Sequence, residues 1–315
     1  MEILKDHKIM EILSKIIIYL VFIFAAPLFI GIVNKLKARS TGRIGPSIFQ
    51  SYYDLRRLVR KETIYAESAS FISRMSPIVS FVSILFAGMI LPIGFTRPLI
   101  SFNGDLILFA YLLGLSRFFQ IMGAMDIGSS FEGMGAAREA TFAVFAEPIY
   151  FFTLGSLAFI FGQTSMYDIF HSITLNDPSF MVFIVVASIS VFFLMITETS
   201  RMPVDDPNTH LELTMIHEVM ILDNSGQDLF LYQYSAYLKI LIYATFTSNF
   251  FNPFNAENYV IGFLVYLTVM VLLIAALVWV ETMVGRFKMK SIPQYLLFAA
   301  SIGILNLLIY SFFRK

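Results

Sequence analysis

Several acidic side chains lie inside or at the ends of long apolar runs of this sequence. Glu139 and Glu147 stand eight residues apart in AAREATFAVFAEP, and Glu198 and Glu281 each end a further apolar run. A charge at the centre of a bilayer costs at least ~2.5–3.5 kcal/mol, so each such residue needs a partner or a function. Carboxylates stepped along a helix can take up and release protons as neighbouring charges change. We therefore interpret this set as a candidate proton path.

Basic residues on the same segments leave a second interpretation open. Arg117 and Arg138 are placed so that they can form static ion pairs with these acids, without any transfer of protons. Buried ion pairs contribute little net stability, because both charges lose their hydration. A whole set of such pairs is a costly way to hold helices together, which favours the proton path for the set.

A dense polar segment at 199–233, here called the fifth connection, follows the Glu198 run. Pro203 and Pro207 predict an irregular stretch, and the apolar spacing from Leu211 to Leu222 predicts a helix after it. The sequence HLELTMIHE does not match the HExxH zinc pattern, so we predict no metal site here. We interpret this acidic connection as a partner interface and a region of proton uptake, with Arg201 as an internal ion-pair partner.

Membrane-spanning helices must hold these charges in place. Of 315 residues, 57% are hydrophobic and 14% are charged, with a mean hydropathy of +0.75; soluble domains have about 45–50% and about 25%. Runs that can cross about 30 Å of hydrocarbon are found at 12–33, 76–94, 105–125, 137–162, 180–198, 234–251, 258–281 and 292–313. The sixth run is the weakest, because Lys239 interrupts its start. We predict an all-α polytopic membrane protein, a single transmembrane domain (1–315) of about eight helices.

The segment at 34–75, here called the first connection, carries most of the basic charge. With the other odd connections it holds fourteen Lys and Arg residues, against six on the opposite side. The side richer in Lys and Arg faces the cytoplasm, so we predict both termini outside. Within it, Ile48, Tyr52, Leu55 and Val59 recur at helical spacing and predict an amphipathic helix in the membrane interface. That helix either lies on lipid or docks a cytoplasmic partner.

The chain contains no cysteine and only four histidines. The absence of cysteine excludes disulfides, thiolate metal sites and iron–sulfur ligation by this chain. We therefore predict that the chain itself binds no cofactor.

Three motifs resemble one family of membrane subunits. They are GPSIFQSYYDLRRLVRKE (45–62), GAAREATFAVFAEP (135–148) and ETSRMPVDDPNTHLELTMIHEVMILDNSG (198–226). Together they resemble the membrane subunit shared by energy-converting nickel–iron hydrogenases, such as formate hydrogenlyase, and complex I (NADH:quinone oxidoreductase), where it is the eight-helix subunit beside the quinone site. PVDDPNTHLELTMIHE is similar to the hydrogenase version, whereas complex I tends to have PFDLPEAE. Asn224 replaces the tyrosine of the complex I EYSG pattern, which weakens the role of the adjacent Asp223.

The resemblance implies partners and site residues. It implies a cytoplasmic hydrogenase large subunit and a small iron–sulfur subunit, which carry the nickel–iron centre and the clusters. It also implies antiporter-like membrane subunits, no nucleic acid, and a prokaryotic cytoplasmic membrane. The first connection then faces the soluble arm through Arg43, Gln50, Asp54, Lys61 and Glu62. The implied proton path is lined by Glu139, Glu147, Glu198, Asp205, Glu212 and Asp223, with Arg117, Arg138 and Arg201 as charge partners.

Four functions stay open on the sequence. The first is a non-catalytic subunit that couples hydrogen evolution to the movement of protons, or of sodium in exchange. The second is the equivalent subunit of a quinone- or sulfur-reducing complex. A quinone site requires a lipid-accessible chamber under the first and fifth connections. The others are a passive membrane anchor and a stand-alone transporter, although no internal repeat supports a transporter.

Overall fold

The structure is a computed structural model that describes residues 2–94, 96–173, 178–205, 215–252 and 259–313. Within these ranges it contains helices and no strands. The helices are α1 (Glu2–Ser40), α2 (Gln50–Val59), α3 (Phe71–Ile90), α4 (Asp105–Ile127), α5 (Ser130–Phe161), α6 (Met166–His171), α7 (Pro178–Glu198), α8 (Gly226–Asn249), α9 (Tyr259–Met283) and α10 (Ile292–Phe313). A long helix covers each of the eight predicted runs. The predicted all-α, polytopic membrane fold is confirmed.

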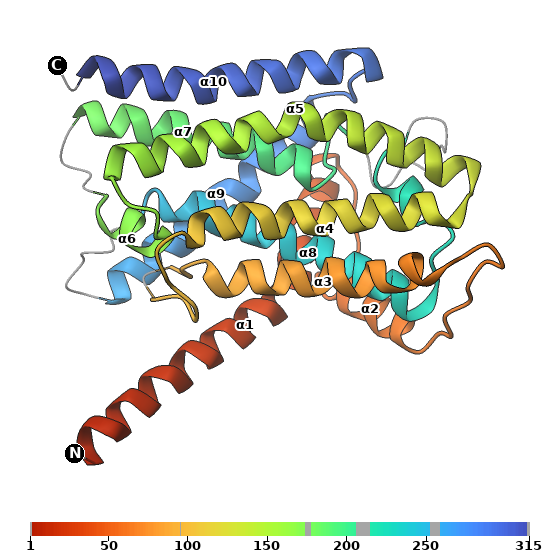
Figure 1. Ribbon diagram of the computed structural model, residues 1–315, viewed down its shortest axis with the longest axis horizontal. Coiled ribbons are helices and arrows are strands. Elements are labelled where there is room, and N and C mark those ends of the chain that lie inside the picture. The colour runs from red at the N-terminus through yellow and green to blue at the C-terminus, as the bar shows by residue number, and fades with distance from the viewer. Residues whose placement is uncertain (1, 95, 174–177, 206–214, 253–258, 314–315) are drawn as a thin grey trace.

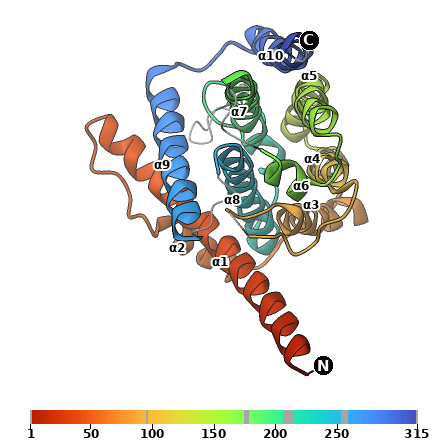
Figure 2. The same cartoon turned by 90° about the vertical axis from the view of Figure 1, so that its left-hand side faces the viewer.

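Helix α8 lies at the centre of the bundle (Figure 2). It contacts α1, α2, α3, α7 and α9, and every residue from Leu238 to Asn249 is buried. In the described part of the chain, seven helices are long and apolar enough to span a membrane, and α8 is not among them. A helix enclosed by protein faces other side chains instead of lipid, so it can carry polar residues. This position explains why the sixth run is the weakest in the sequence.

The connections gather at one end of the bundle. In Figure 1, α1 begins and α10 ends at the left, and the segments on either side of α2 lie at the right. An even number of crossings returns the chain to its starting side, as eight spans require. The first half of α1 projects away from the other helices, and its apolar side chains, such as Met10 and Phe24, are exposed.

The predicted amphipathic helix of the first connection exists as α2, but its packed face differs from the prediction. Ser51, Leu55 and Leu58 are buried, whereas Val59 is 47% exposed. Helix α2 contacts α1 and α8. Because protein covers this face of α2, the helix packs on the bundle through a face rotated from the predicted apolar stripe.

The helix predicted from Leu211 to Leu222 is wrong over residues 215–222, and 206–214 lie outside the described residues. Only Glu218–Ile221 is helical there, as a single 3₁₀ turn. The carboxylate of Asp205 accepts the backbone N–H groups of Ile216 and His217 at 3.1 Å. These amides cap the turn, so this polar anchor overrides the apolar spacing.

The fifth connection is joined to the first just before α8. The N–H of Ile64 donates to Ser225 Oγ at 2.9 Å, and the N–H of Gln227 donates to Thr63 Oγ1 at 3.1 Å. Gly226 has a φ of +53°, and a Cβ there would come within 2.5 Å of the Glu62 carbonyl oxygen. Glycine is therefore required where the two connections meet.

Candidate functional site

Four charged side chains form a cluster inside the bundle. Glu198 at the end of α7 pairs with Arg117 of α4 and with Lys239 of α8, whose Nζ lies 2.9 Å from Glu198 Oε2. Arg117 Nε also lies 3.8 Å from Glu139 Oε1 on α5. All four side chains are at least four-fifths buried. Two cations and two carboxylates balance, which offsets part of the cost of removing them from water.

A second buried pair ties the fifth connection to α9 and α1. Glu281 Oε1 lies 3.2 Å from Arg201 Nη1, and Glu281 Oε2 lies 3.0 Å from Lys37 Nζ. Arg201 is an internal ion-pair partner, as predicted. Its partner belongs to α9, far along the chain. Lys37 reaches Glu281 because α1 continues to Ser40 instead of ending near 33.

Asp205 lies beside the central cluster. Its Oδ1 accepts from Arg286 Nη2 at 2.7 Å, and its side chain is 1% exposed. Arg138 donates to the carbonyl oxygen of Met215 at 2.7 Å. These contacts hold the turn at 215–221 against α5 and the C-terminal end of α9.

The remaining proton-path residues lie elsewhere. Asp223 is exposed, and its N–H donates to Glu132 Oε1 at 2.9 Å. The structure does not bring its carboxylate into the central cluster. Glu212 lies outside the described residues. The proton-path role of both residues stays a prediction.

A polar chamber of about 330 Å³ lies under the first and fifth connections, between α1, α2, α8 and the turn at 218–221. Its charged lining residues are Asp54, Arg201, His217 and Glu218. Burial raises the pKa of Glu218 to about 7; nearby Asp205 adds to this shift and Arg201 opposes it. Burial also lowers the pKa of His217 to about 4. Glu218 thus titrates close to neutral pH, and His217 is neutral there.

Two small pockets continue inward from the chamber. One, of about 20 Å³, is lined by His217, Tyr232, Glu198 and Lys239, among others, and it shares the first two with the chamber. The other, of about 10 Å³, is lined by Arg117, Glu139, Glu198 and Asp205 and shares Glu198 with its neighbour. Each has room for about one water molecule.

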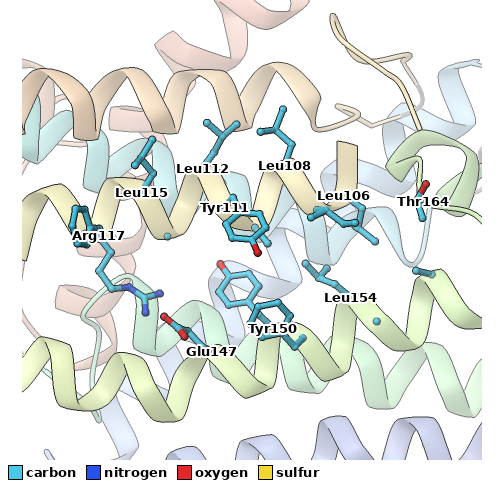
Figure 3. Close-up of a pocket in the computed structure, with 17 residues that line it drawn as sticks. Leu106, Leu108, Tyr111, Leu112, Leu115, Arg117, Glu147, Tyr150, Leu154 and Thr164 are labelled. Carbon is cyan, nitrogen blue, oxygen red and sulfur yellow. The ribbon is translucent and has the colours of Figure 1, made fainter. Parts of the chain in front are cut away.

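A groove of about 600 Å³ opens between α4 and α5 on the far side of the cluster (Figure 3). Its wall is mostly apolar, with Tyr111 and Tyr150 facing one another across it. Arg117 forms part of the wall and points toward Glu147. Glu147 is exposed in the groove and has no hydrogen bond or ion pair to any described residue.

The chamber, the two pockets and the groove form one series. His217 borders the chamber and the first pocket, Glu198 borders both pockets, and Arg117 borders the second pocket and the groove. Titratable side chains and water-sized spaces therefore alternate from the connections to the face of α4 and α5. Such an arrangement can carry protons by short hops between waters and side chains.

The predicted partner-interface residues divide into two groups. Arg43, Lys61 and Glu62 are exposed on the first connection. Gln50 and Asp54 line the chamber, and Gln50 Nε2 donates to Asp54 Oδ1 at 3.1 Å. Their contact with a partner stays a prediction.

Sequence reasoning missed two residues of this series. Lys239 was an interruption of an apolar run, although a lysine there requires a buried acid as partner. His217 was considered only as a metal ligand. For His217, the sequence offers no signal beyond its place in an acidic connection.

The fold and the buried charges define a polytopic membrane subunit with an internal polar route. Comparison with known proteins identifies the family. The NADH dehydrogenase family model matches residues 13–311. The chain is 32% identical over 237 residues to hydrogenase-4 component C of Escherichia coli, covering 75% of this chain and 73% of that protein.

Two further relatives extend the comparison. Formate hydrogenlyase subunit 4 of E. coli is 25% identical, over 90% of this chain and 94% of that protein. A membrane subunit of the NADH-quinone oxidoreductase of Anaplasma phagocytophilum is 23% identical, over 81% and 82%. The chain belongs to this NADH dehydrogenase family of respiratory membrane subunits, as the three motifs predict.

A solved structure shares the fold. A chain of the membrane-bound sulfane sulfur reductase, an archaeal respiratory membrane complex, superposes with a TM-score of 0.80 at 21% identity, covering 95% of this chain and 98% of that chain. At this identity the likeness concerns the fold alone.

Proposed function

We propose that this chain is the membrane-embedded coupling and anchoring subunit of a hydrogen-evolving, membrane-bound hydrogenase complex. It links electron transfer in a cytoplasmic arm to the translocation of protons. The series of cavities joined by His217, Glu198 and Arg117 carries this proposal. A passive anchor has no need for a chamber and a groove connected through a charged core.

The relatives favour the hydrogenase setting. Two of them are named as parts of hydrogenase-4 and of formate hydrogenlyase. In the proposed complex, a hydrogenase large subunit with a nickel–iron centre and a small iron–sulfur subunit dock on the first connection. Antiporter-like membrane subunits dock on the bundle, whose termini face the outside of the cytoplasmic membrane.

The coupling role is tested by Glu139→Gln in the intact complex. Glu139 makes a single long contact, to Arg117, so the amide fits in its place and the complex assembles. Proton translocation into inverted membrane vesicles is measured together with electron transfer. We expect translocation to fall by about tenfold or more, because the amide cannot release a proton. A passive anchor predicts unchanged translocation.

Glu11→Gln is the matched control. Glu11 lies on the projecting part of α1, is about half exposed and pairs with Lys15. The control variant is expected to translocate protons as the unmodified complex does. Equal losses in both variants would contradict the proposed path.

The hydrogenase setting has its own test. The complex is purified through a tag on this chain and analysed for nickel and for hydrogen evolution from a low-potential donor. We expect nickel and hydrogen evolution together. A complex without nickel that reduces sulfur species or quinone would replace the hydrogenase by a relative of it.

Quinone reduction is a second candidate, which the chamber under the first and fifth connections favours. Its charged lining, with Asp54, Arg201 and Glu218, suits water better than an apolar quinone tail. Quinone-site inhibitors distinguish the two functions: they block turnover only when quinone is the electron acceptor.

A further inference from the structure

His217 stands at the boundary between the chamber and the pocket beside the central cluster. It lines both spaces, together with Tyr232 and Ala236. The Tyr232 hydroxyl lies 2.6 Å from Ser76 Oγ, which engages it in a hydrogen bond, and Ala236 has no polar side chain. Of the three boundary residues, His217 is therefore the side chain suited to proton exchange on both sides.

The position of His217 is fixed by its backbone. Its N–H donates to Asp205 Oδ2 at 3.1 Å, and Asp205 is itself held by Arg286 at 2.7 Å. On the other side, Gln120 Nε2 of α4 lies 3.3 Å from both ring nitrogens. The ring is thus held between α4 and the turn, and its boundary position is not that of a loose loop.

The charges around the ring keep it neutral. Burial lowers its pKa, Lys239 of α8 lowers it further, and Glu198 of α7 opposes them. Glu218, its neighbour in the chain, faces the chamber. Neutral imidazole has one nitrogen that accepts a proton and one that donates, so it can pass a proton without a lasting charge.

We propose that the His217 imidazole transfers protons from the chamber to the pocket beside Lys239 and Glu198. One ring nitrogen accepts a proton from a chamber water or from Glu218. The opposite nitrogen releases its own proton to water in the inner pocket. The ring returns to its first tautomer before the next transfer, so its net charge is unchanged over a cycle. This role rests on the proposed function and names the residue that admits protons to the path.

Two variants of the intact complex test this role. In His217→Gln an amide remains that can bond Gln120 but cannot shuttle protons. In His217→Ala the ring is replaced by space continuous with a chamber of about 330 Å³, which admits free imidazole. We expect proton translocation to fall about 100-fold in both, in the range that a positioned acid–base group contributes. In His217→Ala we expect added imidazole to restore it, with a rate that changes when 4-methylimidazole replaces imidazole.

His171→Gln is the control, because His171 lies on α6 and stacks on Tyr167 with ring centroids 5.6 Å apart. It is expected to keep full translocation without imidazole. Loss of translocation in both His217 variants without rescue would overturn the proton role and leave a structural one. Full translocation in the His217 variants, when Glu139→Gln abolishes it, would overturn this inference while the proposed function stands. Full translocation in Glu139→Gln as well would overturn the proposed function itself.

Discussion

The centre and the two ends of the polar route hold their carboxylates in opposite ways. At the centre, Glu198 is fixed between two cations on two other helices. At the ends, Glu218 in the chamber and Glu147 in the groove have no hydrogen bond or ion pair to the described part of the chain. A paired carboxylate stays charged and rigid, whereas an unpaired one can change protonation at low cost. The difference teaches that proton exchange belongs to the ends and charge transmission to the centre.

The largest effect is expected from Glu198→Gln. It leaves Arg117 and Lys239 facing one another with only Glu139 to balance them. Breaking a buried pair on one side costs about 3–5 kcal/mol. We expect the variant to lose most of the assembled complex, measured by native gel electrophoresis of detergent-solubilised membranes.

A charge-balanced variant sharpens this result. Glu198→Gln combined with Lys239→Gln removes one charge of each sign from the cluster. We expect assembly to recover while proton translocation stays low. Recovery of translocation as well would show that the central pair is structural only.

Asp205→Asn is expected to have the next largest effect. The carboxylate accepts two backbone N–H groups and pairs with Arg286, so one substitution weakens three contacts. Hydrogen bonds to charged groups contribute about 1.5–3 kcal/mol each. Arg286→Gln removes only one of them and should destabilise less. Thermal unfolding of the purified complex ranks the two, and equal losses would contradict the anchoring role of Asp205.

The pH dependence of stability separates the two groups of the chamber. Glu218 has a raised pKa, about 7, so its stabilising contribution is present at low pH and is lost as pH rises from about 4.5 to 7. His217 has a lowered pKa, about 4, so its contribution is present above pH 6.5 and is lost as pH falls toward 4. The opposite slopes offset one another in the unmodified protein.

Single variants expose each slope. The melting temperature of His217→Gln should fall as pH rises from about 4.5 to 7, following Glu218. That of Glu218→Gln should rise over about pH 4 to 6.5, following His217. Melting curves of the purified complex across this range measure both. Identical profiles in the two variants would contradict the assignment.

The smallest effect on stability is expected at Glu147. Its carboxylate has no partner among the described residues, so Glu147→Gln should change the free energy of unfolding by less than about 0.5 kcal/mol. Proton translocation should nonetheless fall, because the amide cannot release protons into the groove. A large loss of stability would mean that Glu147 belongs with the paired centre.

The helices could be predicted from the sequence because a membrane span is a local pattern of apolar residues. Pro148, which lies inside α5, and Lys239, which lies inside α8, did not prevent those helices. The acids at 139, 147 and 198 were identified because charge in an apolar run is conspicuous.

The pairing of these charges could not be predicted. Arg201 bonds Glu281 across 80 residues, and neither the length nor the composition of the runs fixes which helices become neighbours. The turn at 218–221 also escaped prediction, because a carboxylate outside it fixes its backbone. The chamber and groove are spaces between elements and leave no local pattern in the sequence.

Infrared difference spectroscopy of the intact complex, reduced minus oxidised, tests the contrast between centre and ends most directly. Carboxyl groups that gain or lose a proton give a C=O stretching band, whereas carboxylates that stay charged give none there. We predict a carboxyl band that weakens in Glu147→Gln and another that weakens in Glu218→Gln, while Glu11→Gln keeps both. Spectra in which both variants retain every carboxyl band of the unmodified complex would contradict proton exchange at the ends of the route.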